Sequence, residues 1–174
     1  MGDGTMELLD VYNADHEPVG RTVPRNGTVA EGERLLVVHV CVLNRRDEML
    51  IQKRQTFKDR YPGCWDLSAG GFVLSGEDSS GAVLRELREE MGISLHAADL
   101  RFLFTWPISY VLDDFYLARS DLPVSNLTLQ QEEVSEAAWV TQAEIEAMIA
   151  DGSFVDYPLD CIQKVFRLSA EMKE

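Results

Sequence analysis

Three glutamates in the middle of the chain have the spacing of a cation-binding cluster. Glu86, Glu89 and Glu90 stand at i, i+3 and i+4, positions that share one face of an α-helix. Like charges this close repel, so the cluster is stable near neutral pH only if a cation neutralises it. Oxygen-only ligands suit Mg²⁺, or alternatively Mn²⁺, better than zinc. The competing interpretation is a solvated acidic helix face in an acidic protein.

The residues around the cluster follow a fixed order of glycine, glutamate and arginine. Segment 71–93 has the form G-x5-E-x7-R-E-L-x-E-E-x-G-I. Glu77 precedes the predicted helix and Arg85 stands four residues before Glu89, so the guanidinium can pair with either carboxylate. We therefore expect Glu77 and Arg85 to orient the loop against the helix.

Two glycines are adjacent at the start of this segment: Gly70 precedes it and Gly71 is its first residue. Without a Cβ, they allow a backbone carbonyl to come close to a metal ion. A tight turn is the alternative interpretation, and the two are compatible.

Segment 71–93 satisfies every fixed position of the Nudix signature, G-x5-E-x7-R-E-U-x-E-E-x-G-U with U apolar. The chain thus resembles the Nudix superfamily over most of its length. The resemblance implies that Gly70, through its carbonyl, and Glu86, Glu89 and Glu90 bind the metal.

The resemblance also implies a further carboxylate about six residues before a Trp-Val pair on the last core strand. In QQEEVSEAAWV, Glu133 has that spacing from Trp139. The neighbouring Glu132 and Glu136 are alternatives for the same role.

The stretch from Val37 to Gly71, with the preceding DVYNADHEPVGRT, looks like the Nudix branch related to isopentenyl-diphosphate isomerase. In that isomerase, a cysteine before the box performs proton chemistry and a histidine after it binds metal. Gly70 and Phe72 occupy those positions here, so hydrolysis is favoured over isomerisation. The resemblance places Arg54 and Lys58 where the isomerase binds its diphosphate; exposed, solubilising cations are the alternative.

These features predict a Mg²⁺-dependent hydrolase that cleaves the diphosphate linkage of a small organic pyrophosphate, with a nucleoside diphosphate derivative as the favoured substrate. Metal ions would neutralise phosphate charge and lower the pKa of an attacking water. Glu86, Glu89 and Glu133 are the candidate general bases. Trp106 and Tyr110 are the candidates for stacking on the substrate. An isomerase-like enzyme and a non-catalytic nucleotide-binding module are the alternatives.

The net charge and the cysteine content restrict the classes of binding partner and the cellular location. A net charge of −14 and a pI near 4.5 oppose binding to nucleic-acid polymers or anionic membranes. The three cysteines have unrelated spacings, and neither a leader nor a long apolar run is evident. We therefore expect a cytoplasmic protein without a disulfide framework, whose partner is a small-molecule diphosphate.

The secondary-structure pattern predicts one α/β domain over residues 1–174, a Nudix-like α/β/α sandwich with a mixed sheet flanked by helices. A β extension is expected over about 1–34, the Nudix box over 71–93 and a C-terminal helix over about 157–172. The other predicted elements are strands at 6–12, 35–43, 49–53, 65–69, 100–106, 114–118 and 136–140, and helices at 80–91 and 141–150.

Two helix boundaries carry specific signals. Asp78 or Ser79 can cap the first helix, and Gly92 follows its last apolar residue. Thr141 with Glu144 forms a capping box. The apolar stripe of helix 157–172 predicts docking against the sheet, with a homodimer contact as the alternative.

Overall fold

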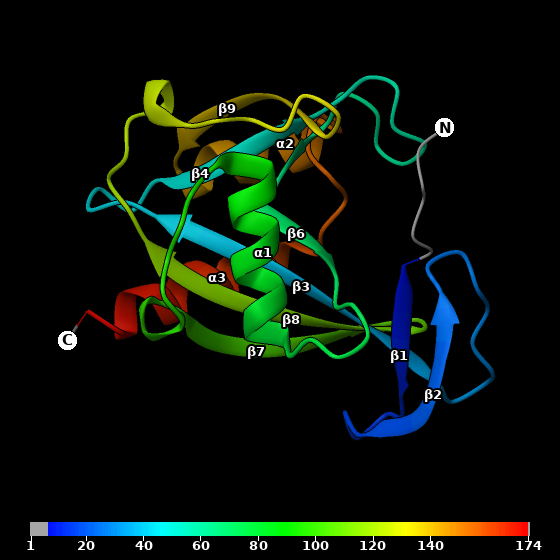
Figure 1. Cartoon of the computed structure of the whole chain (residues 1–174). Helices are drawn as coiled ribbons and strands as arrows, with labels where there is room; N and C mark the ends of the chain where they lie inside the picture. Colours follow the sequence, from blue (N-terminus) through cyan, green and yellow to red (C-terminus); the bar gives the residue numbers. More distant parts are fainter. Residues whose placement is uncertain (1–6, 174) are drawn as a thin grey trace.

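The apolar run at residues 35–43 forms the central strand of the sheet. In the computed structural model, which describes residues 7–173, β3 (Arg34–Leu43) pairs antiparallel with β6 (Ala69–Phe72) and parallel with β8 (Val111–Arg119). Strands of both orientations therefore meet in one mixed sheet, which Figure 1 shows with α1 on one face and α2 and α3 on the other. The predicted fold class is confirmed.

Nine strands and three α-helices make up the described part of the chain. The remaining elements are β1 (Leu8–Tyr12), β2 (Pro18–Pro24), β4 (Met49–Arg54), β5 (Trp65–Asp66), β7 (Arg101–Ile108), β9 (Val134–Val140), α1 (Ser79–Met91), α2 (Gln142–Asp151) and α3 (Leu159–Glu171). Residue 6, the first of the predicted N-terminal strand, lies outside the described residues. No helix within 7–173 is long and apolar enough to cross a membrane.

Alternate side chains of β3 supply two hydrophobic cores. Val38, Val40 and Val42 are buried in the cluster that contains the apolar face of α1. Cys41 and Leu43 are buried with α2 and α3. Because successive strand residues point to opposite faces, a continuous apolar run is what a strand covered on both sides requires.

The predicted capping signals all form. The Asp78 side chain accepts a hydrogen bond from the Gly81 N–H at the start of α1, and Gly92 ends the helix with φ 68°. Thr141 and Glu144 form the capping box of α2. The apolar side of α3 is buried against the sheet, which confirms the predicted docking. The helix starts two residues later than predicted, because Pro158 occupies its N-cap.

β3 and β4 pair antiparallel only at Leu43 and Met49, and β4 then continues between β9 and β5. One interpretation of the sequence is corrected. Gly70 and Gly71 form no tight turn: both lie within β6, opposite His39 and Val38 of β3.

The N-terminal strands β1 and β2 form a hairpin that extends from one end of the sheet (Figure 1). β1 joins the sheet through a short antiparallel pairing of Val11 and Tyr12 with the start of β3. A separate apolar cluster, which includes Leu9 and Val11 and packs against Phe72, anchors the hairpin. The hairpin therefore rests beside the strand that carries the glycine pair.

Candidate active site

The acidic face of α1 lies against β6. Glu90 is 8% exposed, and its Oε2 accepts hydrogen bonds from Gln52 Nε2 at 2.8 Å and from the Gly70 N–H at 3.3 Å. Burial, followed by repulsion from Glu86, raises the pKa of Glu90 to about 8. Burial also raises the pKa of Glu86, against the opposing charges of Arg85 and Arg25. These carboxylates are thus held in a setting that disfavours their negative charge.

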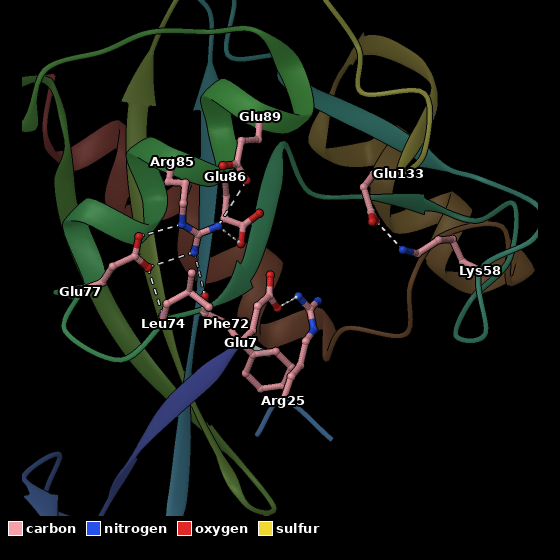
Figure 2. Close-up of polar contacts among 10 residues, drawn as sticks. All are labelled: Glu7, Arg25, Lys58, Phe72, Leu74, Glu77, Arg85, Glu86, Glu89 and Glu133. Carbon is pink, nitrogen blue, oxygen red and sulfur yellow. Dashed lines mark hydrogen bonds and ion pairs between the residues drawn. The ribbon is translucent and has the colours of Figure 1, made fainter. Parts of the chain in front are cut away.

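Arg85 links the helix to the loop that follows β6 (Figure 2). Its Nε and Nη2 donate to the two oxygens of Glu77 at 2.7 and 3.0 Å, and Nη2 also donates to the Phe72 carbonyl at 3.0 Å. Nη1 donates to Glu86 at 2.8 Å and to Glu89 at 3.4 Å. A planar guanidinium can satisfy all of these acceptors at once, which an ammonium group cannot.

The glycine pair gives the site its close packing. A Cβ on Gly71 would overlap the Glu86 carboxylate, and a Cβ on Gly70 would overlap the His39 ring and approach the Val38 carbonyl oxygen to 2.7 Å. Glycine at 71 therefore leaves room for a functional side chain, whereas glycine at 70 is required by the packing of β6 on β3.

Glu133 enters the same cavity from the segment before β9, opposite α1 (Figure 2). Its Oε2 accepts a hydrogen bond from Lys58 Nζ at 2.5 Å. The Gln55 N–H donates to the Glu133 carbonyl at 3.0 Å, which holds the loop after β4 against this segment. Of the two alternatives, Glu136 pairs with Lys53, and neither Glu132 nor Glu136 lines the cavity.

The cavity has a volume of about 420 Å³ and contains acidic and basic groups together. Arg54 also lines it, while its Nη1 donates to Asp66 at 3.2 Å and its Nε to the Arg60 carbonyl at 3.1 Å. The residues predicted from the sequence that meet here are Gly70, Arg85, Glu86, Glu89, Glu90, Glu133, Arg54 and Lys58. Glu77 reaches the group through Arg85.

A second cavity, of about 400 Å³, adjoins the first and shares the glycine pair and Glu90 with it. A buried network lies in its wall: His39 Nδ1 contacts Asp113 at 2.7 Å, and Tyr157 OH hydrogen-bonds to His39 Nε2 at 2.9 Å and to Asp66 at 2.8 Å. Burial lowers the pKa of His39, but Asp113 and other nearby carboxylates outweigh burial and raise it to about 9. The sequence offered no local signal for this long-range network.

The two predicted stacking residues lie in different places. Tyr110 is 46% exposed and lines the second cavity, so it is near the carboxylate cluster. Trp106 lines a different cavity with residues of α3, among them Lys164 and Phe166. Trp106 therefore lines neither the carboxylate cavity nor the second cavity.

The carboxylate cluster fits a hard divalent cation by its donor chemistry. Within residues 7–173, no three acidic, histidine or cysteine side chains converge on a common metal position as they stand. Glu86 and Glu89 instead contact Arg85. If these two carboxylates turn from Arg85 toward a cation, Arg85 keeps its contacts with Glu77. A cation bound beside Glu90 would offset the burial and the repulsion from Glu86 that disfavour its ionised form.

Sequence reasoning missed several residues of this region. Arg25 and Glu7 reach the first cavity from the N-terminal hairpin, and Arg60 reaches it from the loop after β4. A single charged residue next to a turn forms no recognisable motif in the sequence. Its distance from the site depends on how the hairpin packs against the sheet.

Comparisons with known proteins show the family of this chain. The family model of the NUDIX domain matches residues 33–159. An uncharacterized Nudix hydrolase of Listeria monocytogenes is 42% identical over 152 residues, covering 87% of this chain and 90% of the relative. A Nudix hydrolase of Deinococcus radiodurans is 33% identical over 157 residues, covering 87% and 89% of the two chains.

Solved structures share the fold. A Deinococcus radiodurans crystal structure superposes with a TM-score of 0.77 at 27% identity, covering 91% of this chain and 98% of the other. The NUDIX domain of Shewanella oneidensis NrtR, solved as a complex with ADP ribose, gives a TM-score of 0.60 at 22% identity over 76% of this chain and 86% of that one. The similarity to the NrtR domain, at 22% identity, shows a shared fold alone.

Proposed function

This chain belongs to the NUDIX domain family and is a Nudix pyrophosphohydrolase, and we propose that it uses Mg²⁺ to cleave the diphosphate linkage of a nucleoside diphosphate derivative. The observation that carries this proposal is the cavity in which the α1 carboxylates face Glu133, with Arg54 and Lys58 beside them. A diphosphate needs both kinds of group, because cations bind its oxygens and carboxylates hold metal or accept a proton.

Glu86, Glu89 and Glu90, with the Gly70 carbonyl, are the proposed ligands of the cation. When bound, a hard divalent cation supplies charge neutralisation for phosphate oxygens and makes water more acidic. Carboxylate and carbonyl oxygens are the donors that Mg²⁺ prefers, and Mn²⁺ is an alternative with similar preferences. The proposed role of Arg85 and Glu77 is to fix the loop after β6 so that the ligands keep their positions.

Among the three candidate bases, we propose Glu133 as the acceptor of the proton from the attacking water. Glu86 and Glu89 belong to the helix face assigned to the cation, whereas Glu133 approaches from the opposite wall of the cavity. Lys58 contacts Glu133 at 2.5 Å and can orient its carboxylate. Arg54 and Lys58 are also the proposed phosphate-binding residues.

The alternatives receive less support from the same residues. Isomerisation of the isopentenyl-diphosphate type would need a thiol and a histidine where Gly70 and Phe72 stand. A non-catalytic binding module has no need of a carboxylate opposite the cation ligands. ADP ribose bound to the NrtR domain supports a nucleoside diphosphate as ligand class for this fold. The three cysteines, Cys41, Cys64 and Cys161, are free, which agrees with the reducing, cytoplasmic location that we propose.

The test is a substrate panel with matched variants. Nucleotide sugars, nucleoside diphosphates, dinucleotides and isopentenyl diphosphate would be incubated with MgCl₂, with phosphate and nucleotide release followed by chromatography. We expect release from at least one nucleoside diphosphate derivative, and a loss of about a hundredfold or more in Glu133→Gln. The adjacent, exposed Glu132 gives the control, Glu132→Gln, which should keep wild-type turnover. Equal activity of both variants would contradict the role of Glu133, and no release from any compound would contradict the proposed function.

A further inference from the structure

A third cavity, of about 560 Å³, lies between the N-terminal hairpin and the site described above. Its lining residues include Arg25, Asn26, Thr28, Phe72 and Tyr110. Arg25 and Phe72 also line the carboxylate cavity, and together with Tyr110 they line the second cavity. The three cavities are therefore adjoining parts of one concave region, and the hairpin forms its outer end.

Arg25 stands at the junction of these cavities. Its guanidinium lies over the Phe72 ring, 5.5 Å from the centroid, and its Nη1 donates to the Glu7 carboxylate at 2.7 Å (Figure 2). Both members of this ion pair are about half exposed, with side-chain exposures of 52% for Arg25 and 44% for Glu7. An exposed pair of this kind contributes little stability. The carboxylate of Glu7 thus occupies an anion position that a phosphate group can take over.

Arg25 also lies in the same cavity as the carboxylate cluster. It lines the cavity of about 420 Å³ together with Glu86, Glu89 and Glu90. An anion that lies between α1 and the hairpin would therefore have the cation on one side and Arg25 on the other. A diphosphate has two charged groups and can use both.

The lining beyond Arg25 is suited to a planar heteroaromatic group. Phe72 and Tyr110 offer aromatic rings for stacking, and Val29 and Leu35 add apolar contact. The Asn26 amide and the Thr28 hydroxyl supply a donor and acceptors for the edge of a base. A hydrocarbon chain would instead leave these polar groups without partners.

Resting on the proposed function, we infer that this hairpin cavity binds the base of a nucleoside diphosphate substrate and that Arg25 binds the diphosphate between the base and the cation ligands. The volume of about 560 Å³ falls in the range of ordinary small-molecule sites. The N-terminal hairpin then determines substrate choice, while α1 and Glu133 carry out the cleavage. Each half of the inference predicts a different response to mutation.

The experiment separates the two halves with two probes that the enzyme cannot cleave. α,β-Methylene-ADP carries a base and a diphosphate analogue, and methylenediphosphonate carries the diphosphate analogue alone. Calorimetric titrations in MgCl₂ would give the Kd of each probe for the wild-type protein, Arg25→Gln, Asn26→Ala and Tyr110→Ala. The control is Arg45→Gln, because Arg45 is 91% exposed and pairs with Asp121 away from these cavities.

We expect Arg25→Gln to weaken both probes about tenfold or more, since a hydrogen bond to a charged group is lost. Asn26→Ala and Tyr110→Ala should weaken α,β-methylene-ADP about fivefold or more and leave methylenediphosphonate unchanged. Glu7→Gln should tighten both probes, because it removes the competing carboxylate. Arg45→Gln should change neither.

Several results would overturn the inference. Unchanged binding in Arg25→Gln removes the diphosphate contact, and equal weakening of both probes by Asn26→Ala removes the base contact. Weakening of α,β-methylene-ADP by neither Asn26→Ala nor Tyr110→Ala would show that its base binds outside the hairpin cavity. Because the probes are not cleaved, failure of binding is distinct from failure of hydrolysis: a protein that binds as expected without cleaving any panel substrate contradicts only the proposed function.

Discussion

Glu90→Gln tests the assignment of the buried carboxylate, because it removes one negative charge and preserves the shape of the side chain. Gln52 Nε2 and the Gly70 N–H both donate to Glu90 Oε2, and an amide oxygen can accept both bonds. The substitution therefore changes charge without opening a cavity. We expect it to stabilise the metal-free protein and to remove activity.

The stability effect follows from the pKa of Glu90. Its value is raised from 4.5 to about 8 in the folded protein, so folding favours the protonated carboxyl. The contribution of Glu90 to the free energy of unfolding therefore falls as pH rises from about 4.5 to about 8, whereas glutamine does not titrate. At 1.36 kcal/mol per pH unit, this rise corresponds to an upper bound of about 4 kcal/mol near pH 7.5. Structural relaxation reduces this value, and we expect Glu90→Gln to gain at least about 1 kcal/mol.

The assay is thermal unfolding in EDTA between pH 5 and pH 8, with Glu171→Gln as a control at an exposed position of α3. For a chain of this size, 1 kcal/mol corresponds to about 2–4 °C in Tm. The Tm advantage of Glu90→Gln should grow with pH and shrink when Mg²⁺ is added. A Tm difference that is independent of pH would refute the electrostatic reasoning.

Glu90→Gln should lower turnover although it raises Tm in the metal-free protein. Loss of a direct cation ligand should lower kcat/KM about a thousandfold or more, or about 4 kcal/mol of transition-state stabilisation. A variant that keeps more than about a tenth of wild-type turnover would show that Glu90 is not a ligand. A gain in stability with a loss of activity is the combination expected of a charge that is buried for function.

Three further predictions use the geometry of the same site. Gly71→Ala should displace the flexible Glu86 carboxylate and reduce turnover with little change in Tm. Gly70→Ala should instead lower Tm by several degrees, because its Cβ meets the backbone of β3. Measurements of turnover and Tm for both variants check this contrast. Arg85→Lys should reduce kcat about tenfold or more, since an ammonium group cannot hold both oxygens of Glu77 and the other acceptors, and equal kcat would remove Arg85 from a positioning role. Isopentenyl diphosphate should not be isomerised, and deuterium incorporation from heavy water into the allylic product would contradict the assignment to a hydrolase.

Local chemistry explains which parts of the fold could be predicted. Asp78 and Gly92 bound α1, and Thr141 with Glu144 starts α2, because caps act within a single turn of helix. The partners of β4 could not be predicted in the same way. Its pairing with β9 joins residues far apart in sequence, for example Met49 and Val140, and no local pattern marks such a pair.

The same distinction applies to the site. The α1 glutamates lie on one helix, so their spacing in the sequence placed them on one face. Arg25 reaches the cavity only because the N-terminal hairpin packs against Phe72. Trp106 and Tyr110 were equivalent candidates as sequence letters, yet tertiary packing puts Trp106 beside α3 and Tyr110 beside the cavities near Glu90.

The metal requirement of hydrolysis is the most direct test of the central claim. The wild-type protein would be freed of metal by EDTA, exchanged into chelator-free buffer and assayed on a nucleoside diphosphate derivative while MgCl₂ is added back, with Glu90→Gln in parallel. We predict no turnover in the metal-free protein, full recovery of the wild type with Mg²⁺, higher rates toward alkaline pH as water loses its proton more easily, and no recovery of the variant. Full turnover of the wild type in excess chelator would contradict a cation held by the α1 carboxylates.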